Sequence, residues 1–185
     1  MSNFILKYDS NNDETTITTY VNVDDYTNHA NNLQEGELAS PTLPDGVPLK
    51  FIKVESGAVV VKDTYIDNLK STKWNEVKTL RSSRNDEDIT TTEGTWQVDT
   101  VSIANINSGI MTLTDNLDTI SWLDTNNNLI EITKEQLNNI LIDHAIRKVS
   151  IFNASINVKA DIDACTTVEE VNALDVESLL STYTI

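Results

Sequence analysis

The chain contains very few of the residues from which common enzyme sites are built. Its 185 residues include one cysteine, two histidines and five glycines. The sequence has no glycine-rich phosphate loop, no Gly-x-Ser-x-Gly nucleophile turn and no cysteine–histidine pair with a nucleophile signature. We therefore predict no catalytic residue, no cofactor site and no metal site, and we do not expect an enzyme.

The single cysteine, Cys165, excludes an internal disulfide framework and a zinc site built on cysteines. It stands beside a predicted helix cap, where a small buried side chain is expected. Long apolar runs are also missing. Phe4-Ile5-Leu6 is too short for the core of a signal segment, and no run approaches the ~20 residues of a membrane helix. The sequence therefore predicts a soluble chain that is made in a cytoplasm.

Basic residues are scarce as well, with 13 Lys and Arg against 29 Asp and Glu, a formal charge of −16 and a pI of about 4.3. Both parts of the chain share this acidity. Such a surface repels the phosphates of nucleic acids and the anionic surface of a membrane. We therefore expect neither nucleic acid nor membrane among the partners.

The first 70 residues have a β-rich pattern that indicates a small α+β module, with alternating β-branched residues and clusters of turn residues. All three prolines stand in one loop, and Gly57 suits the turn of a hairpin. Strands are expected at residues 4–8, 15–23, 49–54 and 58–62, with a turn at 9–13. A short helix is expected at 24–33, and the proline loop at 37–48.

Residues 71–185 predict a mainly helical domain with a short β-hairpin, so the fold class is α+β. The boundary near residue 70 falls on a helix that is expected to run from Asp63 or Thr64 to about Arg84. A polar loop and a short strand come next. The following helix is capped at Asp99 or Thr100. Its apolar face is expected at Ile103, Ile106, Ile110, Leu113 and Leu117.

A hairpin over residues 121–132 is followed by the longest predicted helix, which begins with a capping box of Thr133 and Gln136 and reaches about Ile162. A second capping box, Thr166 with Glu169, begins a last short helix. The long helix permits self-association, although its apolar spacing does not indicate a sustained heptad. Its buried side is expected at Leu137, Ile140, Leu141, Ala145, Ile151, Ile156 and Ile162.

Two segments resemble calcium loops without meeting the requirements of one. In the first, Leu129 replaces the essential glycine, and strands replace the flanking helices. We therefore expect a β-turn and a helix cap there. In the second, Tyr20 occupies the last ligand position. The matching positions are Asp124, Asn126, Asn128 and Glu135 in the first segment, and Asp9, Asn11 and Asp13 in the second.

His29 and His144 have no metal-ligand spacing to each other. Asp143 and His144 are neighbours on a helix and point about 100° apart, so they do not form an acid–base pair. Asp161 and Asp163 also diverge, and we expect a solvated helix end. The three tryptophans, Trp74, Trp96 and Trp122, belong to periodic elements, so core packing is expected before a sugar-binding face.

The C-terminal part carries an ordered set of short motifs that resembles an uncharacterised domain family of tailed bacteriophages and prophages. The resemblance covers residues 73–175. The family is typically the C-terminal domain of tail proteins, tail-fibre-associated proteins or tail-fibre assembly proteins, and it supplies no catalytic residues. The motifs are Lys73-Trp74, Trp96-Gln97-Val98-Asp99, Ser102-Ile103-Ala104-Asn105-Ile106, Trp122-Leu123-Asp124-Thr125-Asn126-Asn127, Ile132-Thr133-Lys134-Glu135-Gln136-Leu137 and the segment from Lys159 to Val171.

Three hypotheses follow for the function. The first is a non-enzymatic structural component of the virion tail, near the fibre or baseplate, with other tail or fibre proteins as partners. The second is a tail-fibre assembly chaperone that is absent from the mature virion. The third is a receptor- or glycan-binding module of the tail tip that uses exposed aromatic residues. In the first hypothesis, the N-terminal module attaches the chain to its tail or fibre partner.

Overall fold

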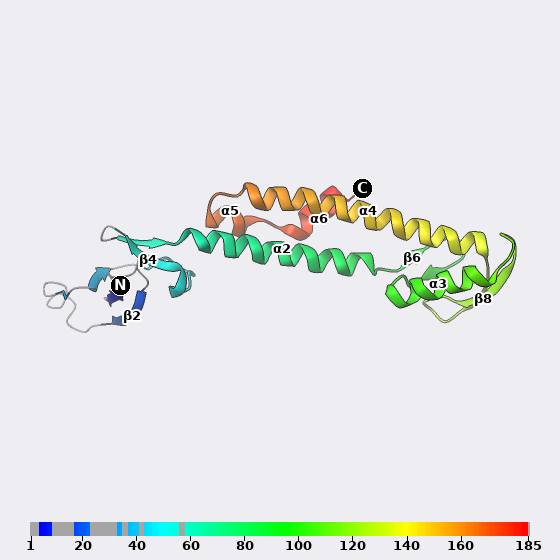
Figure 1. Cartoon of the computed structure of the whole chain (residues 1–185), viewed down its shortest axis with the longest axis horizontal. Helices are drawn as coiled ribbons and strands as arrows, with labels where there is room; N and C mark the ends of the chain where they lie inside the picture. The colour runs from blue at the N-terminus through cyan, green and yellow to red at the C-terminus, as the bar shows by residue number, and fades with distance from the viewer. Residues whose placement is uncertain are drawn as a thin grey trace. The chain divides into compact units, whose positions relative to one another are not determined.

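The computed structural model describes residues 4–8, 17–22, 33–34, 37–40, 43–55 and 58–184. Helices and antiparallel strands occupy separate segments of the chain, which confirms the predicted α+β class (Figure 1). The chain divides into two compact units, Met1–Leu69 and Lys70–Ile185. The division falls within helix α2 (Asp63–Asn85), the helix on which the sequence places a boundary.

The first unit contains a three-stranded antiparallel sheet with strand order β2-β1-β3. In this sheet, Leu6 of the central strand is paired with Tyr20 on one side and Leu38 on the other. The predicted helix at 24–33 and the turn at 9–13 lie outside the described residues, apart from Leu33, which is not helical. The strands are β1 (Phe4–Tyr8), β2 (Ile17–Asn22) and β3 (Glu37–Ser40).

A hairpin of β4 (Ile52–Glu55) and β5 (Ala58–Val61) follows in the same unit. Ile52 and Val54 alternate with more exposed residues and are buried, as the period of a strand requires. The strand expected to begin at residue 49 begins at Ile52, because a 3₁₀ turn, η1 (Leu49–Phe51), precedes it. Pro48 accepts the first bond of that turn from the Phe51 N–H at 2.9 Å.

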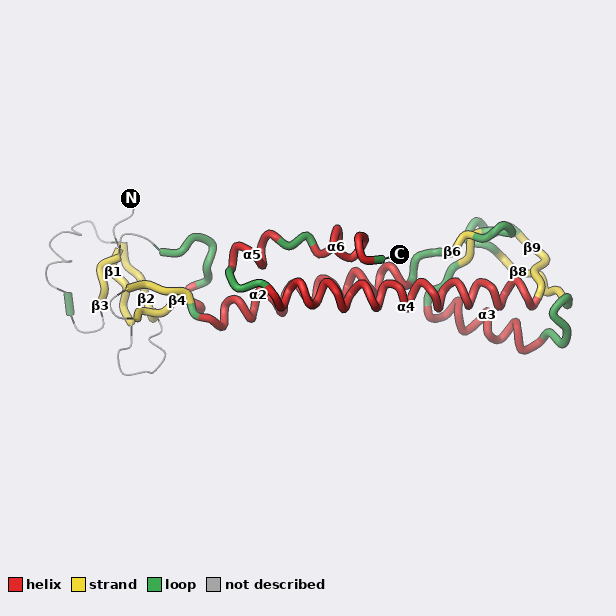
Figure 2. Tube along the Cα trace, turned by 90° about the horizontal axis from the view of Figure 1, so that it is seen from above, coloured by secondary structure: helices red, strands yellow, loops and turns green. Residues whose placement is uncertain are grey.

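The second unit is built on two long helices that run side by side, α2 and α4 (Lys134–Ala164), as Figures 1 and 2 show. Lys70, where α2 enters the second unit, donates from Nζ to the Asp163 carbonyl near the end of α4 at 2.9 Å. At the other end, Arg147 Nη2 lies 2.9 Å from the Asn85 carbonyl. The two helices are therefore antiparallel.

Two short helices, α5 (Val168–Ala173) and α6 (Val176–Tyr183), return along this pair and complete a helical core. Arg84 Nη2 donates to Ser181 Oγ at 2.7 Å, and Lys73 Nζ donates to the Leu174 carbonyl at 3.0 Å. Residues from α2, α4 and α6 form what we call the helical cluster. Its buried members are Val77, Ala154, Val158, Ile162, Val176 and Leu180.

The remaining elements pack against the first turns of α4 and form what we call the end lobe. They are β6 (Ile89–Thr90), β7 (Thr95–Trp96), α3 (Thr100–Thr112), β8 (Thr119–Leu123) and β9 (Leu129–Thr133). The predicted polar loop at 85–95 therefore contains a short strand, because Ile89 pairs with Trp96 and is buried. The buried residues of the lobe are Ile89, Trp96, Val98, Ile106, Ile132, Leu137 and Ile140.

Helix α3 is shorter than its apolar spacing predicts. Asp99 caps its start through N–H donors of Val101 and Ser102, as expected. Its end at Thr112 excludes Leu113 and Leu117 from the helix, and Leu117 is 76% exposed. The chain turns here because Asp118 Oδ2 accepts hydrogen bonds from the Thr114 and Asp115 N–H groups.

Both predicted capping boxes have counterparts, but only one has the predicted residues. Thr133 and Gln136 form the first, since the Thr133 N–H donates to Gln136 Oε1 at 2.8 Å. The second uses Thr167 and Glu170 rather than Thr166 and Glu169. The Glu170 carboxylate also accepts from the Thr166 N–H, which is the largest cause that lowers its pKa.

Candidate functional site

The calcium-like segment of the second unit is a hairpin turn whose oxygen atoms are used internally. Asp124 Oδ1 accepts from the N–H groups of Asn126 and Asn128, each at 2.8 Å, and Oδ2 accepts from Asn128 Nδ2 at 2.9 Å. These bonds, with the Asn128 amide first, hold the pKa of Asp124 below its ordinary value. Glu135 lies in the first turn of α4. The arrangement fixes a tight turn between β8 and β9.

The other metal-like positions, Asp9, Asn11 and Asp13, lie outside the described residues, as does His29. Within the described ranges, no group of three or more His, Cys, Asp and Glu is placed to hold a metal ion. None of the helices in those ranges has the length and apolar character that a bilayer crossing requires.

His144 and its neighbour Asp143 face different surroundings. His144 is buried on α4, whereas Asp143 is exposed. Burial is the largest cause that lowers the pKa of His144, followed by the charges of Lys148 and Arg147. A hydrogen bond that the imidazole donates to the Asn85 backbone carbonyl acts in the opposite direction. The imidazole therefore favours its neutral form in the folded chain.

Arg147, one turn further along α4, closes the C-terminal end of α2. Its guanidinium donates to the carbonyls of Asn85 at 2.9 Å and Asp88 at 3.3 Å, and also to the Glu87 carbonyl. The last carbonyls of a helix lack partners within the helix and carry its negative dipole end, so a cation is well placed there. Arg147 is thus a structural connection between the two long helices.

The acidic residues at the end of α4 also have structural partners. Tyr183 Oη donates to Asp161 Oδ2 at 2.9 Å, and this bond raises the pKa of Tyr183. Asp163 pairs with Lys159 four residues earlier. Cys165 is only partly buried, and its thiol lies 3.4 Å from the Asp161 carbonyl.

The three tryptophans contribute to packing in the second unit. Trp96 is 1% exposed, and its Nε1–H donates to Thr91 Oγ1 at 2.9 Å. Trp74 packs on the helical cluster, and Trp122 packs on the core of the end lobe. The Trp122 ring covers Gly109, where a Cβ would lie 2.8 Å from Cζ3. A partly polar hollow beside Trp122 is lined by Gln97, Ser102, Asn105 and Ser121.

The buried side of α4 differs from the prediction. Two predicted residues, Ala145 and Ile156, are exposed. Four residues that were not predicted are buried, namely His144, Ala154, Ser155 and Val158. The expectation that the apolar spacing is not a sustained heptad stays a prediction, because the seven-residue row on this face includes a histidine. Four of its buried residues are spaced by seven positions, as in a helix that packs along a coiled-coil seam. They are Leu137, His144, Ile151 and Val158.

A second apolar row lies on the opposite, exposed side of α4, and we call it the α4 stripe. Val149 in the row and Val158 on the buried side are nine residues apart, which at about 100° per residue places them on opposite sides. The exposed fractions of its members range from 51% to 62%. The α4 stripe consists of Ile142, Ile146, Val149, Phe152 and Ile156.

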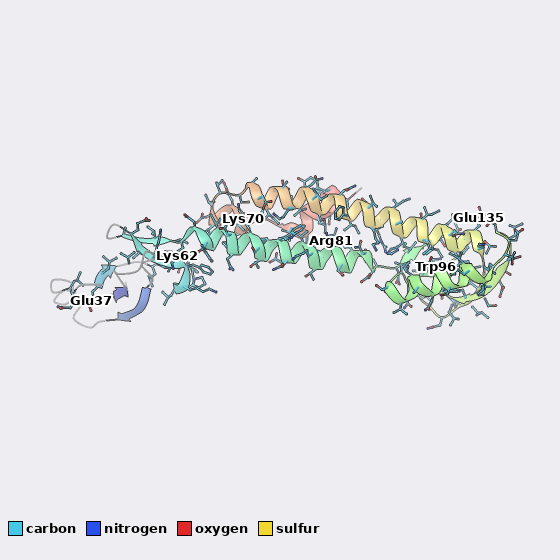
Figure 3. The ribbon with its side chains drawn as sticks, in the orientation of Figure 1. Glu37, Lys62, Lys70, Arg81, Trp96 and Glu135 are labelled. Atoms are coloured by element: carbon cyan, nitrogen blue, oxygen red, sulfur yellow. The ribbon has the colours of Figure 1, made fainter. Side chains whose placement is uncertain are left out.

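The α4 stripe occupies the part of α4 between its contacts with the two cores. Figure 2 shows α4 running from the α5–α6 end of this unit to the end lobe, and Figure 3 labels Arg81 on α2 and Trp96 and Glu135 in the lobe. Arg81 Cζ lies 5.8 Å from the centre of the Phe152 ring, so this ring has a cation beside it. Ile146 and Val149 also line a shallow groove that ends at Tyr183.

The α4 stripe is comparable in size to the largest apolar patch of a typical soluble monomer. An aromatic side chain buries about 150–250 Å² when covered and a branched aliphatic one somewhat less, so these five half-exposed side chains present roughly 500 Å² at most. The largest apolar patch on a typical soluble monomer is about 300–600 Å², and such a patch is often functional. A helix with apolar residues on opposite sides normally has neighbours on both sides. The α4 stripe is therefore the candidate functional site.

Fold and surface together define an α+β protein whose helical unit carries an exposed apolar face on α4. The chain belongs to the family described as "Domain of unknown function (DUF4376)", whose model matches residues 68–178, more than half of the chain. The matched region contains the end lobe and the whole of α4. Comparison with curated proteins and with solved structures found no significant match.

Proposed function

We propose that this chain is a non-enzymatic component of a bacteriophage tail that takes part in protein–protein assembly through the α4 stripe. The resemblance of residues 73–175 to a phage tail family supports the setting. The exposed apolar side of α4 supports the binding role, and it is the observation on which the proposal depends. The location that follows is the tail of the virion.

The magnitude of the apolar surface is consistent with an assembly role. Covering roughly 500 Å² of apolar surface on one partner contributes on the order of 12 kcal/mol before costs. Association costs about 4–15 kcal/mol in lost translational and rotational freedom. The α4 stripe alone therefore supports weak to moderate binding. In a tail assembly, several such contacts acting together would give stable attachment although each contact alone is weak.

A tail-fibre assembly chaperone would use the same surface and then dissociate. The two roles differ in where the protein is found after assembly. The receptor- or glycan-binding hypothesis has less support, because Trp122, the aromatic beside the polar hollow, packs on Gly109 and the core of the end lobe. Its ring is therefore committed to packing.

The test is mass spectrometry of purified phage particles that have been washed extensively. We expect the chain to remain with the particles, and Ile146→Asp to reduce its content at least about tenfold, since a buried charge without a partner is costly. Ser83→Asp adds the same charge on α2, where the residue is exposed, and should leave the content unchanged. Absence of the wild-type chain from washed particles would contradict the structural role and favour the chaperone.

A further inference from the structure

The α4 stripe is placed symmetrically on its helix. Helix α4 extends over Lys134–Ala164, so Val149 is its middle residue. Ile142 and Ile156 lie seven positions before and after it, and Ile146 and Phe152 lie three positions before and after it. The apolar row spans about 21 Å at 1.5 Å per residue. A surface with this arrangement can pair with itself, because an isologous contact places the same patch on both partners.

We infer that the α4 stripe is the self-association surface of this chain, and that its occupant is the α4 stripe of a second copy, related by a twofold axis near Val149. This inference rests on the proposed function, whose binding surface it assigns to a particular partner. The result is a dimer in which two α2–α4 pairs lie back to back. Each α4 is then covered by its own helical cluster on one side and by its copy on the other.

The area agrees with what a stable twofold dimer requires. A standard interface buries about 800 Å² per partner, and about 65% of a homodimer interface is apolar, which is roughly 520 Å². The roughly 500 Å² presented by the five side chains of the α4 stripe is close to this value. The small residue Ala145 and the polar residue Asn153 lie within the width of the row, and Ser150 lies at its edge.

The local charge also permits contact between copies, although the chain carries a charge of −16. Residues 142–156 contain three charged groups, Asp143, Arg147 and Lys148. Arg147 keeps its charge while it donates to the carbonyls at the end of α2, so the segment carries one acid and two bases, a net charge of +1. The segment lacks the acidic excess of the chain, so two copies repel each other less strongly here than they would through most of the remaining surface.

The experiment is light scattering coupled to size-exclusion chromatography on the full chain. We expect a mass of twice 20.6 kDa for the wild type at micromolar concentration. Val149→Asp should raise the dimer Kd at least about 100-fold, because the twofold axis brings two like charges together. Val149→Lys should do the same, and an equimolar mixture of the two variants should restore a dimer. Ser83→Asp should remain dimeric, and circular dichroism checks that each variant is folded.

A wild-type chain that stays monomeric up to about 100 μM, well above the Kd that such an area supports, overturns the self-association. A dimer that withstands both substitutions at Val149 overturns it too. The virion experiment separates this failure from failure of the proposed function. Monomeric protein whose content in particles still falls with Ile146→Asp leaves the tail role in place with another partner. A dimer disrupted at Val149, with no chain in washed particles, leaves the self-association in place and removes the structural tail role.

Discussion

Arg147 is the residue whose removal should reveal how the two long helices are connected. Arg147→Ala deletes a charged group that serves three carbonyls at and beyond the end of α2. Hydrogen bonds to charged groups contribute about 1.5–3 kcal/mol each, and these share one partly exposed group. We expect the free energy of unfolding to fall by about 2–3 kcal/mol.

Urea unfolding followed by tryptophan fluorescence measures this effect, because Trp74, Trp96 and Trp122 all belong to the second unit. The neighbour Lys148 is exposed on the same helix and provides a matched control, since Lys148→Ala should change stability by less than about 0.5 kcal/mol. Equal losses for the two substitutions would show that Arg147 has no special connection to α2.

His144 should make the second unit sensitive to mildly acidic pH. Burial lowers its pKa below the ordinary value of 6.5, with Lys148 and Arg147 contributing in the same direction, so the unfolded chain binds the proton more readily than the folded chain. The stabilisation is therefore complete above about pH 6.5 and is lost as the pH falls from there through the folded pKa. Asp86, whose charge raises the pKa, reduces the effect.

Thermal unfolding between pH 7.5 and 5.5 is the measurement, with His144→Gln as the comparison. We expect the melting temperature of the wild type to fall more steeply over this interval than that of the variant. The carboxylates with lowered pKa, such as Asp124 and Glu170, act at lower pH and in both proteins. Parallel curves for the two proteins would rule out His144 as the source.

Among the helices and strands, α3 packs closely on β8 because Gly109 of α3 has no side chain. Alanine in place of a helical glycine normally stabilises by about 0.5–1 kcal/mol. At Gly109 the new Cβ would lie 2.8 Å from Trp122 Cζ3, and Leu137 Cδ1 lies on the same side at 3.7 Å. Overpacking costs about 1–3 kcal/mol, so the clash outweighs the gain. We expect Gly109→Ala to destabilise the chain by about 1–2 kcal/mol.

The adjacent Ser108 is exposed on the same helix, and Ser108→Ala should be neutral or slightly stabilising. In a double-mutant cycle on urea stability, Trp122→Leu should remove most of the cost of Gly109→Ala, because the ring is the group that clashes. A cost that persists without the ring would point to the backbone of α3 instead.

The structural features that a few neighbouring residues determine are the ones that the sequence predicts correctly. Thr133 and Gln136 contact each other across one helical turn, so three residues of sequence are enough to predict the cap. Where two residues compete locally, the prediction misses by one, as with Thr166 and Thr167, whose N–H groups both reach Glu170. Strand β6 has no local signal, because Ile89 is buried by its pairing with Trp96 and by the end lobe.

For the whole molecule, the α+β class could be predicted from the sequence, but the candidate site could not. Ile156 was expected on the buried side of α4 and is exposed, while Val158 is buried. The reason is that α4 has apolar residues on two opposite sides, and the pattern of a single helix does not show which side meets α2. The seven-residue spacing of Ile142, Val149 and Ile156 was the available signal. Whether these three residues are exposed depends on contacts between distant segments of the chain.

The antiparallel pairing of α2 with α4 also determines when this unit can be completed during synthesis. The bonds that join the two helices connect residues 62 and 93 positions apart, and the helical cluster needs α6 as well. The residues of the end lobe, by contrast, are nearly contiguous along the chain. Domains fold as their residues emerge from the ribosome, and contacts between distant residues form late. During synthesis, the end lobe would therefore fold first. Val77 of α2 would stay exposed until α6 has left the ribosome.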